Sequence, residues 1–132
     1  MQSNAFSAGD LRVVDGDDVE YRGQRFRLAG FDTPQVDALR SNMDRSLEQQ
    51  RGQMAKLHLQ VLIAAARSVH LIDWEAPLKN GGRRLATLLL DGRDVRDIAL
   101  AEGWGVDYRA RKEVDWGDKA LPFFGMQRIE TA

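Results

Sequence analysis

The amino-acid sequence predicts an α+β fold dominated by a small five-stranded Greek-key β-barrel with two helices. Three observations lead to this prediction. Short β-type runs separated by Gly-containing turns occupy residues 10–31. A long segment of helical spacing follows over 46–67, and two further strands precede a short helix with capping signals. This order of elements matches a barrel of the oligonucleotide-binding (OB) type.

A three-stranded meander is expected over roughly residues 10–31. Its strands are separated by two tight turns, Asp15-Gly16 and Arg22-Gly23. Glycine tolerates the positive φ angles that two-residue hairpin turns require, so each pair predicts a hairpin. The three β-type runs are 11–14, 19–21 and 26–31.

The next segment changes from a period of two to helical spacing. Residues 36–45 are polar and aperiodic, and are expected to form a loop. The helix that follows, over about 46–67, is expected to bury one apolar face. That face consists of Met54, Leu57, Val61, Leu62 and Ala65.

The second half of the chain predicts two strands and a second helix. Strands are expected at 69–72 and 84–90, with a turn at 80–82 between them and another tight turn at Asp91-Gly92. Asp94 is a good N-cap for the second helix, and Gly103 is placed to end it.

Length and composition predict one soluble globular domain over 1–132. Hydrophobic residues make up 43% and charged residues 30%, which excludes the disordered and membrane classes. Residues 1–9 are expected to be a disordered remnant of a tag, and 109–132 a C-terminal tail. No apolar stretch is long enough to span a bilayer, so no membrane partner is expected. A monomer is favoured.

Charge and cysteine content limit the function classes further. The net charge is −1 and the isoelectric point about 6.1. Contact with nucleic acid must therefore rely on a local cluster of arginines, because domains that bind through their whole surface field are strongly basic. The chain has no cysteine, which excludes disulfides and thiolate metal sites. No signal peptide is visible, and the compartment stays open.

Four charged residues stand out: Asp17, Arg27, Asp32 and Arg83. Each alone has a simpler explanation, in a turn, on an outward strand position or at a strand end. Together, two carboxylates suit a hard cation such as Ca²⁺. Two arginines suit the oxygens of a phosphodiester, since a guanidinium binds phosphate with two parallel hydrogen bonds. Spacing alone does not bring these four side chains together.

The sequence resembles the staphylococcal nuclease (thermonuclease) family. The matching stretches are VVDGDDV at 13–19, FRLAGFDTPQ at 26–35, the helix entry around Gly52, and GRRLATLLLDGRDV at 82–95 with AEG at 101–103. The resemblance covers about residues 11–108. It implies an OB-type barrel and a secreted or membrane-tethered Ca²⁺-dependent phosphodiesterase, hence an extracytoplasmic location with DNA or RNA as the partner.

The resemblance assigns roles by position. Asp17 and Asp32 match the family's calcium carboxylates, and Thr33 matches the residue whose backbone carbonyl binds the same ion. Arg27 and Arg83 match the two phosphate-binding arginines. Tyr108 lies within one residue of a tyrosine that the family uses near the nucleotide.

Gln35 departs from the family pattern, which has glutamate as the general base at this position. Glutamine keeps the length and an acceptor oxygen, so it can orient a water, but it cannot take up a proton near neutral pH. A positioned general base is worth about 10²–10⁴ in rate, so slower turnover is expected. Asp37 is an alternative base that no spacing requires.

The other candidate residues also have ordinary structural explanations. Asp18 either adds negative charge near the cation or faces solvent. Arg84 is expected to be solvated. The clusters Arg93/Arg96 and Arg109/Arg111/Lys112 either extend a phosphate-binding rim or are ordinary surface charge. The aromatic residues Trp104, Trp116, Phe123 and Phe124 either stack on bases or pack.

Three functions remain open at this point. The first is a Ca²⁺-dependent nuclease of low sequence specificity, impaired by Gln35. The second is a catalytically inactive nucleic-acid-binding domain, which would show salt-dependent affinity without a metal requirement. The third, a pure interaction domain, is disfavoured because it gives the four charged residues no role.

Overall fold

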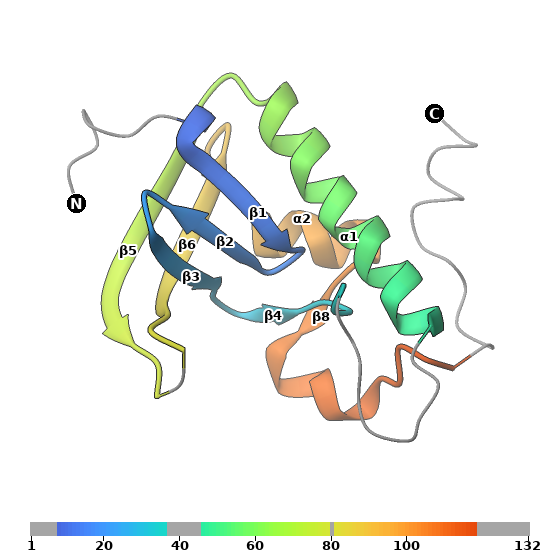
Figure 1. Ribbon diagram of the computed structural model, residues 1–132. Helices are drawn as coiled ribbons and strands as arrows, with labels where there is room; N and C mark the ends of the chain where they lie inside the picture. Colours follow the sequence, from blue (N-terminus) through green and yellow to red (C-terminus); the bar gives the residue numbers. More distant parts are fainter. Residues whose placement is uncertain (1–7, 37–45, 80, 119–132) are drawn as a thin grey trace.

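The computed structural model describes residues 8–36, 46–79 and 81–118, and has an α+β architecture (Figure 1). The predicted loop at 37–45, the residues 1–7, Asn80 and the residues 119–132 lie outside this description. In chain order the elements are η2 (Ala8–Asp10), β1 (Leu11–Asp15), β2 (Asp18–Tyr21), β3 (Gln24–Leu28), β4 (Phe31–Asp32), α1 (Ser46–Ala65), β5 (Val69–Pro77), β6 (Arg84–Leu90), β7 (Arg93–Asp94), α2 (Val95–Glu102), β8 (Val106–Asp107) and η3 (Tyr108–Glu113), where η denotes a 3₁₀ helix.

The main sheet has the strand order β1-β2-β3-β6-β5, with β7 paired to β6. All of its neighbours are antiparallel except β3 and β6, which are parallel. The short strands β4 and β8 form a separate antiparallel pair. The predicted meander over 10–31 is confirmed as β1, β2 and β3.

The predicted α+β class is confirmed, whereas the described residues form an open sheet rather than a closed barrel. The main sheet has six strands and stays open, because β1 and β5 do not pair. A cavity of about 830 Å³ lies there instead, lined by the start of β1, the last turns of α1 and Val69. The C-terminal end of α1 thus lies at the opening between β1 and the start of β5.

Two of the predicted turns adopt the geometry that their sequences require. Arg22 and Gly23 have φ angles of 50° and 86°, and Asp91 and Gly92 have 51° and 80°. Positive φ at both central residues is the mark of the tight hairpin turn whose twist matches that of the flanking strands. These turns set the registers of β2 with β3 and of β6 with β7.

The core fills the inner face of the sheet and the space beneath the helices. Trp104 and Phe31 are fully buried, and their rings meet edge to face with centroids 6.2 Å apart. Each fully buried large apolar side chain contributes about 1.5–3 kcal/mol of transfer free energy. The remaining core residues are Val13, Val19, Phe26, Leu28, Ala55, Leu59, Leu71, Ala86, Leu88, Leu90, Val95, Ile98 and Ala99.

The helix predicted over 46–67 exists as α1, but its predicted buried face is wrong. Leu57 and Val61 are 50% and 57% exposed, and Ala65 is exposed. The buried residues of the helix are Arg51, Gly52, Ala55 and Leu59. Gly52 meets the backbone of Gln35, and Arg51 donates to the carbonyls of Trp116 and Asp118. Close backbone approach and hydrogen bonding, not side-chain hydrophobicity alone, therefore select the buried face. Met54 and Leu62 remain at its edge.

The second helix, α2, has the predicted caps. The Asp94 carboxylate accepts a hydrogen bond from the Arg96 amide at 2.9 Å, and Gly103 ends the helix with φ of 83°. Both are standard ways of satisfying the unpaired backbone groups of helix ends. None of the helices within the described residues is long and apolar enough to cross a membrane.

Candidate functional site

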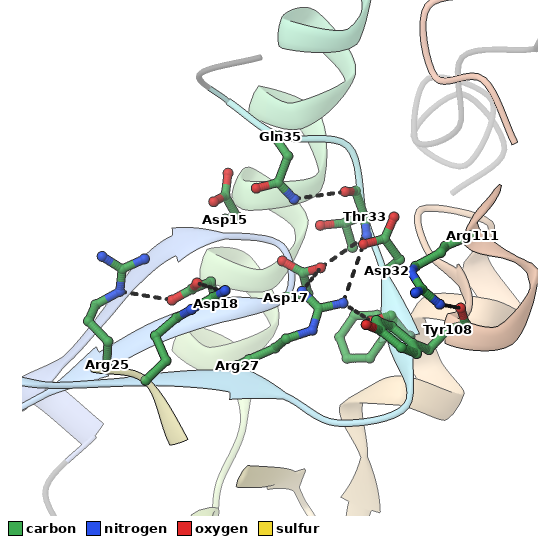
Figure 2. A network of polar contacts seen from close by, with 12 residues as sticks. Asp15, Asp17, Asp18, Arg25, Arg27, Asp32, Thr33, Gln35, Tyr108 and Arg111 are labelled. Atoms are coloured by element: carbon green, nitrogen blue, oxygen red, sulfur yellow. Dashed lines mark hydrogen bonds and ion pairs between the residues drawn. The ribbon is translucent and has the colours of Figure 1, made fainter. Parts of the chain in front are cut away.

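Arg27 lies at the centre of the site, where it joins two carboxylates from different segments (Figure 2). On β3 it alternates with the buried Phe26 and Leu28, so it points away from the core. Its Nη1 donates to Asp17 Oδ2 at 3.1 Å, and its Nη2 donates to Asp32 Oδ1 at 3.3 Å. The structure therefore brings together three of the four residues singled out in the sequence.

Backbone contacts hold these three residues in place. Asp17 occupies the turn between β1 and β2, and its carbonyl accepts from the Leu28 amide at 2.8 Å. Arg27 Nη2 also donates to the Phe31 carbonyl at 3.0 Å, just before Asp32 at the end of β4. The guanidinium is thus tied to the same strand end that carries one of its carboxylate partners.

Burial changes the acid–base properties of this cluster. Asp17 is only 1% exposed, and loss of hydration raises its pKa to about 7. Arg27 opposes this shift, while the nearby Asp32 and Asp15 reinforce it. Burial alone would lower the pKa of Arg27, but the two carboxylates outweigh that effect and raise it. Arg27 therefore stays charged, while Asp17 can exchange a proton near neutral pH.

The segment after β4 places Thr33 and Gln35 beside the carboxylates. The Thr33 amide donates to Asp17 Oδ2 at 3.2 Å. The Thr33 carbonyl, assigned to the metal by resemblance, accepts from Gln35 Nε2 at 3.0 Å (Figure 2). Gln35 thus uses its amide as a donor to the backbone. A glutamate carries no such donor when ionised, so the substitution removes a base and also occupies the carbonyl.

Gly52 explains how α1 fixes this segment. A Cβ atom at that position would lie 2.4 Å from the carbonyl carbon of Gln35 and 2.5 Å from its oxygen. Such distances are far shorter than any van der Waals contact, so only glycine allows the helix to pass here. The helix entry noted in the sequence around Gly52 is therefore the contact that supports Gln35.

Asp18 does not face solvent, which was one of the two interpretations considered for it. It is buried, its Oδ1 accepts from Arg25 Nε at 2.9 Å, and its Oδ2 accepts from Arg83 Nη1 at 2.9 Å. It therefore neither faces solvent nor approaches the Asp17–Asp32 pair through these oxygens. Its effect is to hold Arg83, whose side chain is still 30% exposed, at the start of β6.

A basic pocket of about 280 Å³ adjoins the carboxylate pair. Four of its seven lining side chains are cationic and one is acidic, so its field favours an anion. The two arginines expected to bind phosphate are among them. The lining residues are Arg27, Asp32, Leu78, Lys79, Arg83, Tyr108 and Arg111.

Tyr108 forms one wall of the basic pocket, as its resemblance-based assignment implies. Its amide donates to the Gly30 carbonyl at 3.0 Å, which ties η3 to the turn after β3. The guanidinium carbons of Arg27 and Arg111 lie 4.9 Å and 3.9 Å from its ring centroid. Both are within the range of a cation–π contact, which fixes the aromatic ring beside the cations.

Sequence reasoning missed Lys79 and gave Arg111 only as one option for a rim. Lys79 belongs to the β5–β6 connection, and Arg111 to η3. No local pattern links these segments to Arg27, because contacts between distant parts of the chain, such as the parallel β3–β6 ladder and the Gly30–Tyr108 hydrogen bond, bring them together. Asp37, the alternative base, lies outside the described residues.

The oxygen donors present fit a hard cation. Asp17, Asp32 and the Thr33 carbonyl are ligand types that Ca²⁺ prefers. The buried Thr33 Oγ1 has no hydrogen-bond partner among the described residues, and the pKa of Asp17 is raised by burial; both indicate a place where a polar partner is favourable.

The other candidates pack or pair elsewhere. Arg84 is not simply solvated, because it binds Asp73 at 2.7 Å. Arg96 and Arg109 both bind the carboxylate of Asp107. Trp104 is buried in the core and stacks on His58, so it packs rather than binding bases.

Comparison with known proteins adds no assignment. Neither the protein-family models nor the curated proteins contain a match to this chain. A proposal for its function therefore has to come from the basic pocket and the Arg27 cluster, together with the sequence resemblance.

Proposed function

We propose that this chain is a Ca²⁺-dependent nuclease of low sequence specificity that hydrolyses phosphodiester bonds of DNA or RNA slowly. The observation that carries the proposal is the position of the basic pocket beside the Asp17–Asp32 pair. An anion held by arginines next to two carboxylates is the arrangement that metal-assisted phosphodiester hydrolysis requires. We also propose the finer fold assignment, an OB-type barrel left partly open, and membership of the staphylococcal nuclease family.

The arginines supply the phosphate contacts. Within the described residues Arg27 donates three hydrogen bonds, so two of its five N–H groups remain for a ligand. Within the same residues Arg83 donates one hydrogen bond, to Asp18, so its other N–H groups remain for a ligand. The two guanidinium groups bind the non-bridging oxygens and stabilise the negative charge that builds up on them in the transition state.

Asp17, Asp32 and the Thr33 carbonyl would hold the ion. Bound Ca²⁺ would supply Lewis-acid stabilisation of the phosphoryl oxygens. Gln35 can orient the attacking water through its amide oxygen but cannot accept its proton, which passes to solvent instead. The new P–O bond forms on the side opposite the leaving oxygen, whose bond to phosphorus breaks.

The second candidate is a non-catalytic nucleic-acid-binding domain. One contact favours it: Gln35 donates to the Thr33 carbonyl, so position 35 supplies no base and its donor competes with an ion for that oxygen. Such a domain would bind nucleic acid through the basic pocket with strong salt dependence and without Ca²⁺.

Cleavage of single-stranded DNA and RNA, with Ca²⁺ or with chelator, separates the two functions. We expect slow Ca²⁺-dependent cleavage by this chain, and a rate about 10²–10⁴ higher for Gln35→Glu, which restores a general base. Gln60→Glu is the matched control, because it makes the same change at an exposed position of α1 beside the large cavity. Activity in Gln35→Glu alone would favour the binding domain, and activity in neither would refute the nuclease.

A further inference from the structure

The outward face of β5 exposes two large apolar side chains. Trp74 is 51% exposed and Ile72 is 42% exposed. The indole Nε1 of Trp74 donates to Thr87 Oγ1 on β6 at 2.9 Å. Its polar atom is therefore satisfied and its orientation restrained, while much of the ring surface stays open to solvent.

Trp74 lies on the same side of the sheet as Arg27. Leu28 pairs with Ala86, which pairs with Asp73 in turn. Leu28 and Ala86 point into the core, and side chains alternate along each strand. The next residues outward are Arg27 and its partner Leu85 on β3 and β6, and Trp74 on β5, where the register with β6 shifts after Asp73. The hydrogen bond between Trp74 and Thr87, two residues after Leu85, agrees with this placement.

The separation between the two residues is short on the scale of a nucleic-acid strand. The strands β3, β6 and β5 are consecutive neighbours in the sheet (Figure 1). Two strand spacings correspond to about 10 Å. That distance corresponds to about three nucleotides of a stacked strand, at about 3.4 Å each, and to fewer nucleotides of an extended strand.

We propose that Trp74 is a stacking platform for an unpaired base of a single-stranded nucleic acid whose phosphate occupies the basic pocket. This inference rests on the proposed function and names its substrate class. The cationic pocket attracts the backbone, and the open indole attracts the flat face of a base. A base within a duplex already has neighbours on both faces, so the platform selects single strands.

Binding of oligonucleotides of two lengths tests the platform. A fluorescein-labelled thymidine octanucleotide is titrated in EDTA, so that nothing is cut, and an unlabelled thymidine dinucleotide is measured by competition. The proteins are the wild type, Trp74→Ala, Trp74→Phe, and Leu57→Ala as a control that removes an equally exposed apolar residue from α1.

We expect Trp74→Ala to weaken octanucleotide binding about 5- to 150-fold, the loss of one stacked base. Its dinucleotide binding should stay unchanged, because the basic pocket is intact. Trp74→Phe should retain most of the affinity, and Leu57→Ala all of it. The preference for single over double strands should shrink in Trp74→Ala alone.

The outcomes separate this inference from the proposed function. If Trp74→Ala binds the octanucleotide as the wild type does, or weakens both ligands equally, the platform is refuted while the basic pocket stands. If the wild type binds neither ligand in EDTA, the platform is refuted; if it also fails to cut single strands with Ca²⁺, the nuclease is wrong as well.

Discussion

The buried carboxylate of Asp17 predicts an unusual dependence of stability on pH. Its pKa is raised to about 7 in the folded protein, chiefly by loss of hydration, whereas an unfolded aspartate has a pKa of 3.8. Between these values the folded protein binds a proton that the unfolded chain has released. Stability must therefore fall as the pH rises through this window, the opposite of the usual behaviour of a paired carboxylate.

The size of the effect follows from the two pKa values. One pKa unit corresponds to about 1.4 kcal/mol, so a rise from about pH 4.5 to 7 removes about 3 kcal/mol of unfolding free energy. This is a large fraction of the stability of a domain of this size. Asp107 does not interfere, because hydrogen bonds from Arg109 lower its pKa and it is charged throughout the window.

Asp17→Asn is the matched perturbation. It keeps the shape and an oxygen that can accept from Arg27 and from the Thr33 amide, but it does not titrate. Urea unfolding in EDTA, followed by circular dichroism at several pH values across the window, gives the unfolding free energy of both proteins. Subtracting the two curves removes contributions from the histidines, which both proteins share.

The expected difference curve is flat at acidic pH and changes by about 3 kcal/mol toward neutral pH, where the variant is relatively more stable. Parallel curves for the two proteins would refute the reasoning, since they would mean that Asp17 releases its proton without cost in the folded state. A difference of the opposite sign would mean that Arg27 outweighs burial.

Two further predictions concern the segment that carries Gln35. Gln35→Met removes the donor to the Thr33 carbonyl at similar length, so Ca²⁺ affinity measured by calorimetry should rise by about 2- to 10-fold, the worth of one net hydrogen bond; weaker binding would show that Gln35 is itself a ligand. Gly52→Ala should lower the unfolding free energy by about 1–3 kcal/mol, although alanine favours helices, because its Cβ meets the Gln35 backbone. Substitution of the exposed neighbour, Gln53→Ala, should not lower the unfolding free energy. Equal effects at both positions would argue against the close approach at Gly52.

Local patterns predicted the strands and caps well, because their causes lie within a few residues. The outward position of Arg27 follows from period-two alternation with Phe26 and Leu28. The caps of α2 follow from the preferences of Asp94 and Gly103. The prediction of the buried face of α1 was wrong because its cause is not local. A hydrophobicity pattern favours large side chains, whereas the close approach of the Gln35 backbone requires Gly52 to be buried.

The site itself required contacts between distant segments. Spacing could suggest that Asp17 and Asp32 are acidic ligands, but their meeting at one guanidinium depends on the turn between β1 and β2 and on β4. Asp18 was left with two interpretations because its partner, Arg83, is 65 residues away. Lys79 could not be predicted, because the residues beside it in the sequence form no motif that indicates a phosphate site.

The parallel pairing of β3 with β6 has a consequence for the order in which the basic pocket assembles. Arg27 lies on β3 and Arg83 directly precedes β6, and the hydrogen bond from Arg83 to Asp18 joins residues 65 positions apart. Contacts of such long range are slow to form, because chain entropy is lost before they stabilise the fold. The N-terminal hairpins can therefore form early during synthesis, while the paired arginines assemble late, after most of the chain has been made.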